Sequence, residues 1–423
     1  MLTPEVQNSF VDILRSELIP ATGCTEPIAI AYCGAKMRQV LGVLPERVLV
    51  EVSGNILKNA KSVVVPNTGG MKGVSSAAAV GIVAGNADAL LQVISAVPAE
   101  ARAEVAAFMQ NTPITVTCPD TPFMLDIQIT GWAGGDKAVV RIAESHTNIV
   151  YIEKNGEVQL KKELAAAADK EHAGKNLLTL ENVYTFATEV DVNLVSDLLD
   201  RQLAYNSAIA EEGLKNNWGS NIGSLLLEHY GSDIAVEARA WASAGSDARM
   251  SGCEMPVVIV SGSGNQGITA SMPVYRYAKH LGVSQEKLYR ALIMSDMVTI
   301  YQKAGIGRLS AYCGAISAGV GAGAGIAYLL GADCGAIGHT ITNAVAILSG
   351  CICDGAKPSC AAKIAAAVEA GIVGYRMHLS GNDFHPGDGI IGKDTNDTVD
   401  NVGVLAREGM RSTDRVILSV MTK

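Results

Sequence analysis

Three cysteines in the last third of the chain are the residues whose types and spacing most clearly predict chemistry. Cys353 and Cys360 flank a bend that contains glycine and proline, and Cys313 lies 40 residues upstream of Cys353. This spacing differs from the paired CxxC motifs of structural zinc sites. Three thiolates could instead hold an iron–sulfur cluster in which one iron has no protein thiolate. Such an iron is a Lewis acid that can polarise a leaving group. The alternative is that these free cysteines are small apolar residues of the core.

A neighbouring cysteine, Cys351, competes with Cys353 for the same role. The two side chains would point to roughly opposite sides of a helix and would crowd one face of a strand, so both are not expected to bind one centre. Cys353 directly precedes the turn. We therefore predict that Cys353 is a ligand and that Cys351 is not.

Cys24 is predicted to lie at the start of a helix. The segment Ala21–Pro27 (ATGCTEP) is typical of a turn that leads into a helix, because proline is tolerated in the first helical turn. Backbone N–H groups and the helix dipole favour a thiolate there, so we expect Cys24 to be partly ionised near neutral pH and able to act as a base. The alternative is an ordinary helix cap. His146 is a second candidate proton carrier, although a lone histidine beside a strand is more often structural.

Two glycine-rich segments could bind an anion through their backbone N–H groups. Ser261–Gly267 (SGSGNQG) follows an apolar run, and Pro66–Gly73 (PNTGGMKG) adds the positive charge of Lys72. Each could hold a phosphate or a substrate carboxylate, and each is equally compatible with a plain turn before a helix. The first segment is similar to the Gly-Asn loop of pyridoxal-phosphate dehydratases, but no convincing Schiff-base lysine segment precedes it.

The composition indicates a globular protein with a closely packed interior. The 423 residues carry 33 Lys plus Arg against 42 Asp plus Glu, a net charge of −9, so a nucleic-acid partner is disfavoured. Only 5% of residues are aromatic whereas 44 are glycine, which predicts close backbone packing.

The first residues do not resemble a secretory signal, and nine cysteines are an odd number, as expected of reduced thiols. These features predict a cytoplasmic location.

Two long uncharged runs raise the alternative of a membrane protein. Leu309–Ala332 is long enough to span a bilayer, and Cys334–Cys353 is nearly so. The first run is mostly glycine and alanine and has no aromatic belt at its ends, while Asp333 and His339 interrupt its continuation. We therefore favour a pair of buried helices and predict no membrane association.

The order of the expected elements indicates an α+β fold with two lobes. Residues 1–153 are predicted to form an α+β lobe that carries the Thr-Gly-Cys-Thr-Glu-Pro turn, residues 154–190 a connection, and residues 191–423 an all-α lobe that carries the cluster cysteines. Apart from a helix over 3–18 and one from Ile28 to Val40, the first lobe is expected to contain strands at Arg47–Ser53, Lys61–Val65, Ile114–Cys118, Leu125–Thr130, Lys137–Ile142 and Asn148–Glu153. The helices of the second lobe are expected at Val192–Ala210, Ile222–Tyr230, Ala235–Ala244, Val274–His280, Gln285–Lys303, Ser310–Leu330, Gly335–Leu348, Ala361–Val373 and Thr398–Gly409.

Taken together, the motifs resemble those of the iron–sulfur L-cysteine desulfidases, relatives of the bacterial iron–sulfur L-serine dehydratases. The resemblance covers nearly the whole chain, through ATGCTEP at 21–27, PNTGGMKG at 66–73, SGSGNQG at 261–267, YCGA at 312–315 and CDGAKPSC at 353–360. It implies a pyridoxal-independent α,β-elimination of L-cysteine to pyruvate, sulfide and ammonia on a [4Fe-4S] cluster with one open iron. The serine dehydratases carry Ser-Ser-His-Thr where this chain has Thr-Gly-Cys-Thr, and a longer insertion between their last two ligand cysteines. This departure favours cysteine over serine as substrate.

The resemblance also implies roles for individual residues. Cys313, Cys353 and Cys360 match the cluster ligands, and Cys24 matches the thiol that accepts the α-proton. We predict that the substrate is bound by Thr22, Asn67, Thr68, Gly69, Lys72, Ser263 and Asn265.

Several alternatives stay open from the sequence. Cys24 could be a cluster ligand and not the base, L-serine could be the substrate, and the chain could be a pyridoxal-phosphate lyase or a non-catalytic cluster-binding or membrane-associated protein. The expected partner is a small amino-acid substrate, and a homodimer is one option for the oligomeric state.

Overall fold

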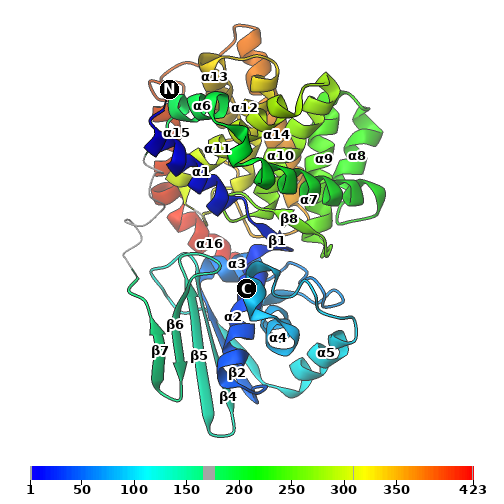
Figure 1. The fold of residues 1–423 in the computed structure, drawn as a ribbon, viewed down its shortest axis with the longest axis vertical. Coiled ribbons are helices and arrows are strands. Elements are labelled where there is room, and N and C mark those ends of the chain that lie inside the picture. The colour runs from blue at the N-terminus through cyan, green and yellow to red at the C-terminus, as the bar shows by residue number, and fades with distance from the viewer. Residues whose placement is uncertain (1, 165–176, 308, 422) are drawn as a thin grey trace.

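Two lobes are stacked along the long axis of the molecule (Figure 1). The computed structural model describes residues 2–164, 177–307, 309–421 and 423. The lower lobe combines helices with a mixed sheet, and the upper lobe is almost entirely helical, which confirms the α+β fold predicted from the sequence. The middle of the predicted connection 154–190 lies outside the described residues. Its flanks contain a strand, β7 (Glu157–Lys161), and a helix, α6 (Leu180–Glu189).

The lower lobe is built on a six-stranded sheet with the order β3-β2-β4-β5-β6-β7. Strands β2 and β3 are parallel and all other neighbours are antiparallel. The alternating sequence Arg47–Val52 produces an alternating burial pattern in β2, as expected of a sheet with one covered face. The remaining strands are β3 (Ile114–Thr117), β4 (Asp126–Ala133), β5 (Asp136–Ala143) and β6 (Ile149–Lys154).

Two helices cover one face of this sheet, α2 (Thr25–Leu41) and α4 (Gly73–Ala84). They approach closely because Gly81 has no side chain, and a Cβ there would lie 2.0 Å from the Ala31 carbonyl oxygen. Helix α5 (Ala101–Asn111) packs on α4, and η1 (Ala87–Gln92) packs on α2. The predicted strand Lys61–Val65 is wrong. Only Val64 forms an isolated bridge, to Lys72, because the chain has just left a short helix, α3 (Gly54–Ala60).

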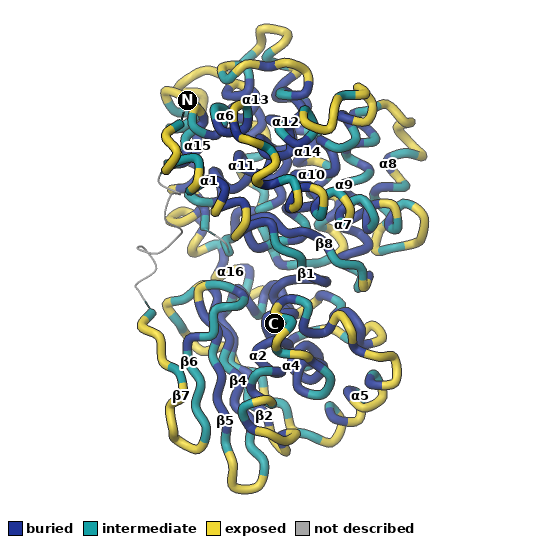
Figure 2. Tube along the Cα trace, viewed as in Figure 1, coloured by how far each residue is buried: buried dark blue, intermediate teal, exposed yellow. Residues whose placement is uncertain are grey.

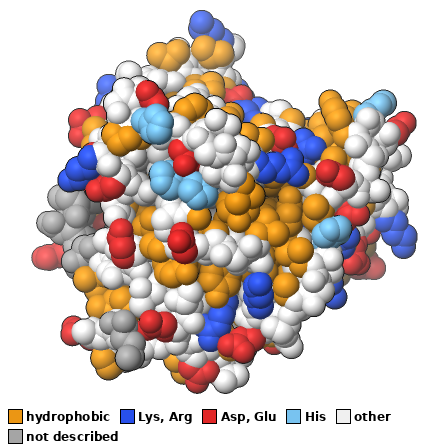
Figure 3. Space-filling model, turned by 90° about the horizontal axis from the view of Figure 1, so that it is seen from above, with side chains coloured by type: hydrophobic (Ala, Val, Ile, Leu, Met, Phe, Trp, Pro, Cys, Tyr) orange, Lys and Arg blue, Asp and Glu red, His pale blue; other side chains and the backbone are white. Residues whose placement is uncertain are grey.

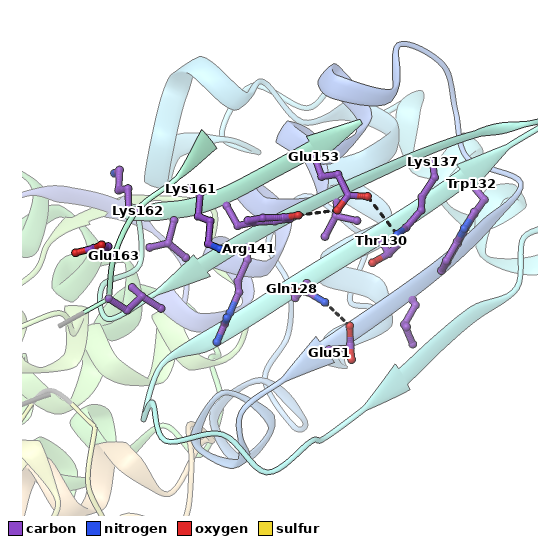
Figure 4. Close-up of a pocket in the computed structure, with 15 residues that line it drawn as sticks. Glu51, Gln128, Thr130, Trp132, Lys137, Arg141, Glu153, Lys161, Lys162 and Glu163 are labelled. Carbon is purple, nitrogen blue, oxygen red and sulfur yellow. Dashed lines mark hydrogen bonds and ion pairs between the residues drawn. The ribbon is translucent and has the colours of Figure 1, made fainter. Parts of the chain in front are cut away.

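The opposite face of the sheet is open and polar. Glu51, Gln128, Lys137, Arg141 and Glu153 line a broad groove of about 850 Å³ along this face (Figure 4). The Gln128 amide donates to Glu51 over 2.6 Å, and Lys137 lies 3.3 Å from Glu153. The charges of Lys137 and Glu153 offset each other, and among the described residues no cysteine lines the groove.

The upper lobe surrounds a central glycine-rich helix, α12 (Gly314–Leu329). Figure 2 shows α12 and its neighbour α11 mostly buried. Gly323 of α12 meets Gly371 of α14, where a Cβ would lie 2.6 Å from the facing Cα, so the backbones pack directly together. This packing explains the high glycine and low aromatic content. The other helices are α7 (Ser196–Lys215), α8 (Ile222–Tyr230), α9 (Ile234–Met250), α10 (Gly264–Leu281), α11 (Gln285–Ile306), α13 (Cys334–Ile347), α14 (Cys360–Leu379), α15 (Thr395–Val404) and α16 (Arg411–Met421), with short turns η3 (Val192–Leu194) and η4 (Leu405–Gly409).

The two ends of the chain cross between the lobes. Helix α1 (Pro4–Glu17) lies in the upper lobe (Figure 1), where Phe10 meets Phe186 edge to face at 5.4 Å. Strand β1 (Pro20–Thr22) then pairs with β8 (Pro256–Val258) of the upper lobe. At the other end, α16 packs on α3 of the lower lobe, where Asp414 forms a buried ion pair with Lys58 at 2.5 Å.

Among the described residues, no helix combines the length and the apolar character needed to cross a membrane. The uncharged run Leu309–Ala332 forms the buried helix α12 and its flanks.

Candidate metal-binding active site

A cavity of about 100 Å³ lies where the two lobes meet. The lower lobe contributes Cys24, Glu26 and Asn59 to its lining. The upper lobe contributes Arg249, Ser263, Asn265, Gln266, Lys303, Leu309, Ser310, Tyr312, Cys313, Gly314, Ala315, Cys353, Gly355, Ala356 and Cys360. The structure thus brings four cysteines to one place from segments far apart in the sequence, the first at position 24 and the last at position 360.

Four helices begin at this cavity. Cys24 is the N-cap of α2, Ser263 is the N-cap of α10, Cys313 is the N-cap of α12, and Cys360 is the first residue of α14. All four residues line the cavity. The first N–H groups of a helix have no partner within the helix, and its N-terminus carries partial positive charge. The cavity is therefore favourable for anions.

A short backbone pairing brings Cys313 and Cys353 together. Tyr312 and Ile352 form an antiparallel bridge, and the Cys313 N–H donates to the Cys351 carbonyl over 3.1 Å. The thiols of Cys351 and Cys353 both interact with that of Cys313. Of these two, Cys353 lines the cavity and Cys351 does not.

Cys360 reaches the cavity because the loop before α14 turns back sharply. Gly355 adopts φ +95°, and a Cβ there would lie 2.3 Å from the Lys58 carbonyl oxygen. This conformation favours glycine. Cys360 packs against a small apolar cluster that contains Cys24. The bend predicted from glycine and proline is thus present and faces α3.

The surroundings of these thiols raise the pKa of most of them. The hydrogen bond with Cys351 raises the pKa of Cys313 to about 11, and the hydrogen bond with Cys313 raises the pKa of Cys353. Burial raises the pKa of Cys360. In contrast, the hydrogen bond from Cys313 lowers the pKa of Cys351 to about 7. Metal ligation needs thiolates, so binding a metal here would release protons.

Cys24 is not the ionised thiol that we expected from its helix N-terminus. It is 4% exposed, and burial raises the pKa of its thiol well above the usual range, with the charge of Glu26 acting in the same direction. The Cys24 thiol donates a hydrogen bond to Glu26 Oε2 over 3.2 Å. Glu26 Oε1 accepts a hydrogen bond from Asn59 over 3.1 Å. Desolvation thus outweighs the helix dipole, and the thiol is held against a carboxylate.

Arg249, at the end of α9, places a buried positive charge in the cavity lining. The residue is 2% exposed, and its Nη1 donates to Asn265 Oδ1 over 3.0 Å. Its Nε and Nη2 are buried without a hydrogen-bond partner among the described residues. The same holds for Tyr312 Oη and Gln266 Oε1 of the cavity lining. Buried donors of a charged group are costly to leave unpaired, so this arrangement indicates a polar, anionic ligand.

The structure places the other predicted substrate-binding residues elsewhere. Thr22 lies in β1 and does not line the cavity, nor does any residue of Pro66–Gly73. Asn67 donates to the Ile94 carbonyl over 2.7 Å, and the Thr68 hydroxyl donates to the Val65 carbonyl over 2.7 Å. Gly69 and Lys72 are exposed. Within the same segment, Pro66 packs against Gly23. A Cβ on Gly23 would lie 2.3 Å from the Pro66 ring, so the segment packs directly against the turn that carries Cys24. His146 is buried and does not line the cavity.

Seven polar residues of the lining were not predicted from the sequence: Glu26, Asn59, Arg249, Gln266, Lys303, Ser310 and Tyr312. Glu26, Gln266 and Tyr312 lie inside motifs that were already singled out, so their neighbours could have indicated them. Asn59 and Arg249 belong to segments without any such motif, and only the packing of α3 and α9 brings them to the cavity.

The donor set suits an iron–sulfur cluster. Three cysteine thiols beside polar side chains of the cavity lining match the ligands of a cluster in which one iron has no protein thiolate. Four helix N-termini and the Arg249 guanidinium would offset the negative charge of such a cluster and of a bound carboxylate. The residues present therefore fit the group that the sequence predicted.

An α+β lobe and a helical lobe that share a thiol-lined cavity define a candidate metal-dependent enzyme. Residues 91–419 match the model of the serine dehydratase alpha chain family, and the chain belongs to that family. It is 51% identical over 413 residues to a UPF0597 protein of Desulfitobacterium hafniense, covering 98% of this chain and 96% of that protein. It is 48% identical to a UPF0597 protein of Lachnoclostridium phytofermentans, covering 97% and 98%. A UPF0597 protein of Bacteroides fragilis is 37% identical over 427 residues.

Proposed function

We propose that the protein is an iron–sulfur lyase that removes sulfide from L-cysteine without pyridoxal phosphate. The observation that carries this proposal is the meeting of Cys313, Cys353, Cys360 and Cys24 in one cavity beside the Arg249 guanidinium, whose Nε and Nη2 have no partner among the described residues. Membership of the serine dehydratase alpha chain family supports the lyase class. The reaction would take place in the cytoplasm, where thiols stay reduced.

Cys313, Cys353 and Cys360 would hold a [4Fe-4S] cluster. When bound, the cluster supplies an open iron, a Lewis acid that can accept the sulfur of the substrate as leaving group. Sulfur is a soft ligand and pairs well with iron. Cys351, which contacts Cys313 from outside the cavity lining, would support the ligand thiols without holding the cluster.

The Arg249 guanidinium would bind the carboxylate of the amino acid. Its Nε and Nη2 are buried without partners, and arginine presents N–H groups in a fork that matches a carboxylate. Ser263 and Asn265, which line the cavity at the start of α10, would complete this binding through N–H and side-chain groups. The Asn265 side chain also fixes the guanidinium, because its Oδ1 accepts from Nη1.

Cys24 would take the proton from Cα. Its thiol must first lose its own proton, and Glu26 Oε2 lies 3.2 Å away to receive it. Burial of the thiol and the charge of Glu26 oppose this ionisation, whereas the charge of Arg249 favours it. Cys24 and Glu26 would thus act as a pair that holds and moves one proton.

The proposed reaction balances in atoms and electrons. The Cα–H bond breaks, its electron pair forms the Cα–Cβ double bond, and the Cβ–S bond breaks with its electrons leaving on sulfur. The aminoacrylate product tautomerises to an imine, and one water then replaces ammonia. The sum is L-cysteine plus water giving pyruvate, hydrogen sulfide and ammonia.

The test is anaerobic purification followed by measurement of iron, acid-labile sulfide and products. We expect iron and sulfide in the protein and equal amounts of pyruvate and sulfide from L-cysteine. Substituting serine for Cys313, Cys353 or Cys360 should remove iron and activity, whereas Cys351→Ser and the control Cys334→Ser should keep both. Full iron content in the Cys353 or Cys360 variant, or an iron-free active protein, would overturn the proposal.

L-serine is the second candidate substrate, because the matching family is that of serine dehydratases. The same geometry would then expel water instead of sulfide. Comparing kcat/KM for the two amino acids on the same iron-loaded preparation decides between them, with L-cysteine expected to be favoured.

A further inference from the structure

Two histidines and an aspartate converge at the end of the helical lobe remote from the cysteine cavity. His339 lies in α13, His378 in the last turn of α14, and Asp383 in the loop after α14. The Nδ1 atom of His378 lies 2.9 Å from Asp383 Oδ2, and that of His339 lies 3.3 Å from the same oxygen. The two rings are stacked with centroids 4.8 Å apart. One potential ligand atom from each residue lies within 4.8 Å of the others.

This cluster is separate from the site already described. Helix α14 begins at the cavity with Cys360 and reaches His378 eighteen residues later. At 1.5 Å per residue the helix spans about 27 Å between them. A ligand here would not touch the residues that line the cavity.

Asn343 positions the carboxylate for the two histidines. The buried Asn343 amide donates from Nδ2 to Asp383 Oδ1 over 2.8 Å, and its Oδ1 accepts from the Phe384 N–H over 3.1 Å. One carboxylate oxygen is thereby occupied, while Oδ2 is directed at the imidazoles. The loop is fixed at its start as well, because the Gly381 N–H donates to the His378 carbonyl with Gly381 at φ +69°. Such outer contacts commonly orient the ligands of metal sites.

The chemistry of the three groups matches a transition-metal ion. Two imidazole nitrogens and one carboxylate oxygen suit zinc and related divalent ions, whereas calcium and magnesium prefer oxygen ligands alone. The side chains of His339, His378 and Asp383 are 50%, 27% and 13% exposed, so an ion can enter and water can complete its coordination. Figure 3 views the molecule from above and shows histidine and acidic side chains next to each other on this surface.

We propose that His339, His378 and Asp383 bind one divalent first-row transition-metal ion, with Zn²⁺ as the representative. The ion would join α13, α14 and the loop after α14 at a single point. The alternative is a metal-free cluster in which both imidazoles share hydrogen bonds with Asp383, and the test distinguishes the two.

The test compares Zn²⁺ binding by the wild-type protein and by the double variant His339→Gln/His378→Gln, using equilibrium dialysis and metal analysis. Both proteins keep all nine cysteines, so zinc bound by thiols cancels in the comparison. His280→Gln is the control, because this exposed histidine of α10 lies outside the cluster. We expect wild type and control to bind one Zn²⁺ per chain more than the double variant. X-ray absorption should show nitrogen and oxygen ligands for that additional ion.

A single, more conservative variant tests the proposal even if the double variant fails to fold. Asp383→Asn keeps an oxygen for Asn343 but removes the charge that faces the histidines, so it should weaken Zn²⁺ binding at least tenfold while circular dichroism stays unchanged. Equal zinc stoichiometry and affinity in wild type and in both cluster variants would overturn the proposal in favour of the metal-free cluster.

Discussion

Replacing Arg249 by methionine tests whether the cavity recognises a carboxylate. Methionine retains an unbranched apolar chain but removes the charge and every N–H group of the guanidinium. Hydrogen bonds to charged groups contribute about 1.5–3 kcal/mol each, and two nitrogens of Arg249 are unpaired. We expect a loss of about 3 kcal/mol of binding, which corresponds to about a 100-fold fall in kcat/KM. Because the carboxylate is bound alike before and during the reaction, KM should rise more than kcat falls.

The same substitution should leave the protein at least as stable as the wild type. It removes a buried charge that has unpaired donors, and the free energy of unfolding of the metal-free protein should therefore stay constant or rise. The control is Arg239→Met in the same helix, α9. Arg239 pairs with Glu369 at 3.2 Å outside the cavity. This control should keep KM unchanged and lose about 1 kcal/mol of stability or less.

The assay is steady-state formation of pyruvate by anaerobically loaded protein, with iron content measured on each sample. A kcat/KM for Arg249→Met within about threefold of wild type, at full iron content, would refute carboxylate binding by Arg249. A loss of iron in this variant would show that the guanidinium balances the charge of the cluster instead.

Three further predictions concern the base, the ligand loop and a buried acid. Cys24→Ala should keep its iron but stop the exchange of solvent deuterium into Cα of bound L-cysteine; an altered cluster spectrum without substrate would instead make Cys24 a ligand. Gly355→Ala should lower iron content without removing a thiol, since its Cβ would meet the Lys58 carbonyl and its φ is +95°, whereas Gly350→Ala, with open space around it, should not. Burial raises the pKa of Asp296 to about 7, so the folded state keeps a proton that the unfolded chain releases above about pH 4. The contribution of Asp296 to the free energy of unfolding should therefore fall as pH rises from about 4 to 7. In denaturant titrations, the free energy of unfolding of Asp296→Asn should rise relative to that of the wild type by up to about 4 kcal/mol at pH 8. Parallel pH profiles of the two proteins would contradict this.

Periodicity predicted most of the fold because burial follows it directly. The alternating segment Arg47–Val52 has one covered face, and the long apolar runs of the second half form helices that pack on several sides. The strand expected at Lys61–Val65 failed because β-branched residues there are buried by tertiary contact next to a short helix, not by sheet pairing. Sequence periodicity does not distinguish these two reasons for burial.

The parts of the candidate site that consist of chemically unusual residues could be predicted from the sequence. The parts whose role depends on tertiary packing could not. Cysteines beside glycine and proline stand out in any sequence, and the cavity contains the four that were selected. The glycine-rich segment Pro66–Gly73 looked equally suited to bind an anion but packs behind Gly23 instead. The pKa of Cys24 was predicted in the wrong direction because its burial and the partner carboxylate of Glu26 depend on how the lobes meet.

The crossing of both chain ends has a mechanical consequence. Helix α1 and strand β1 belong to the upper lobe although they precede the lower one, and α16 returns to α3 at the other end. The upper lobe is therefore not one continuous piece of chain, and a fragment that begins after β1 would leave β8 without its partner strand. The lobes also cannot swing apart about one linker, because the passage from β1 into α2 and the contact between α16 and α3 hold them together at separate points. Under the proposed function, a substrate would therefore reach the cavity through movements of side chains and loops while the thiols of both lobes stay in place.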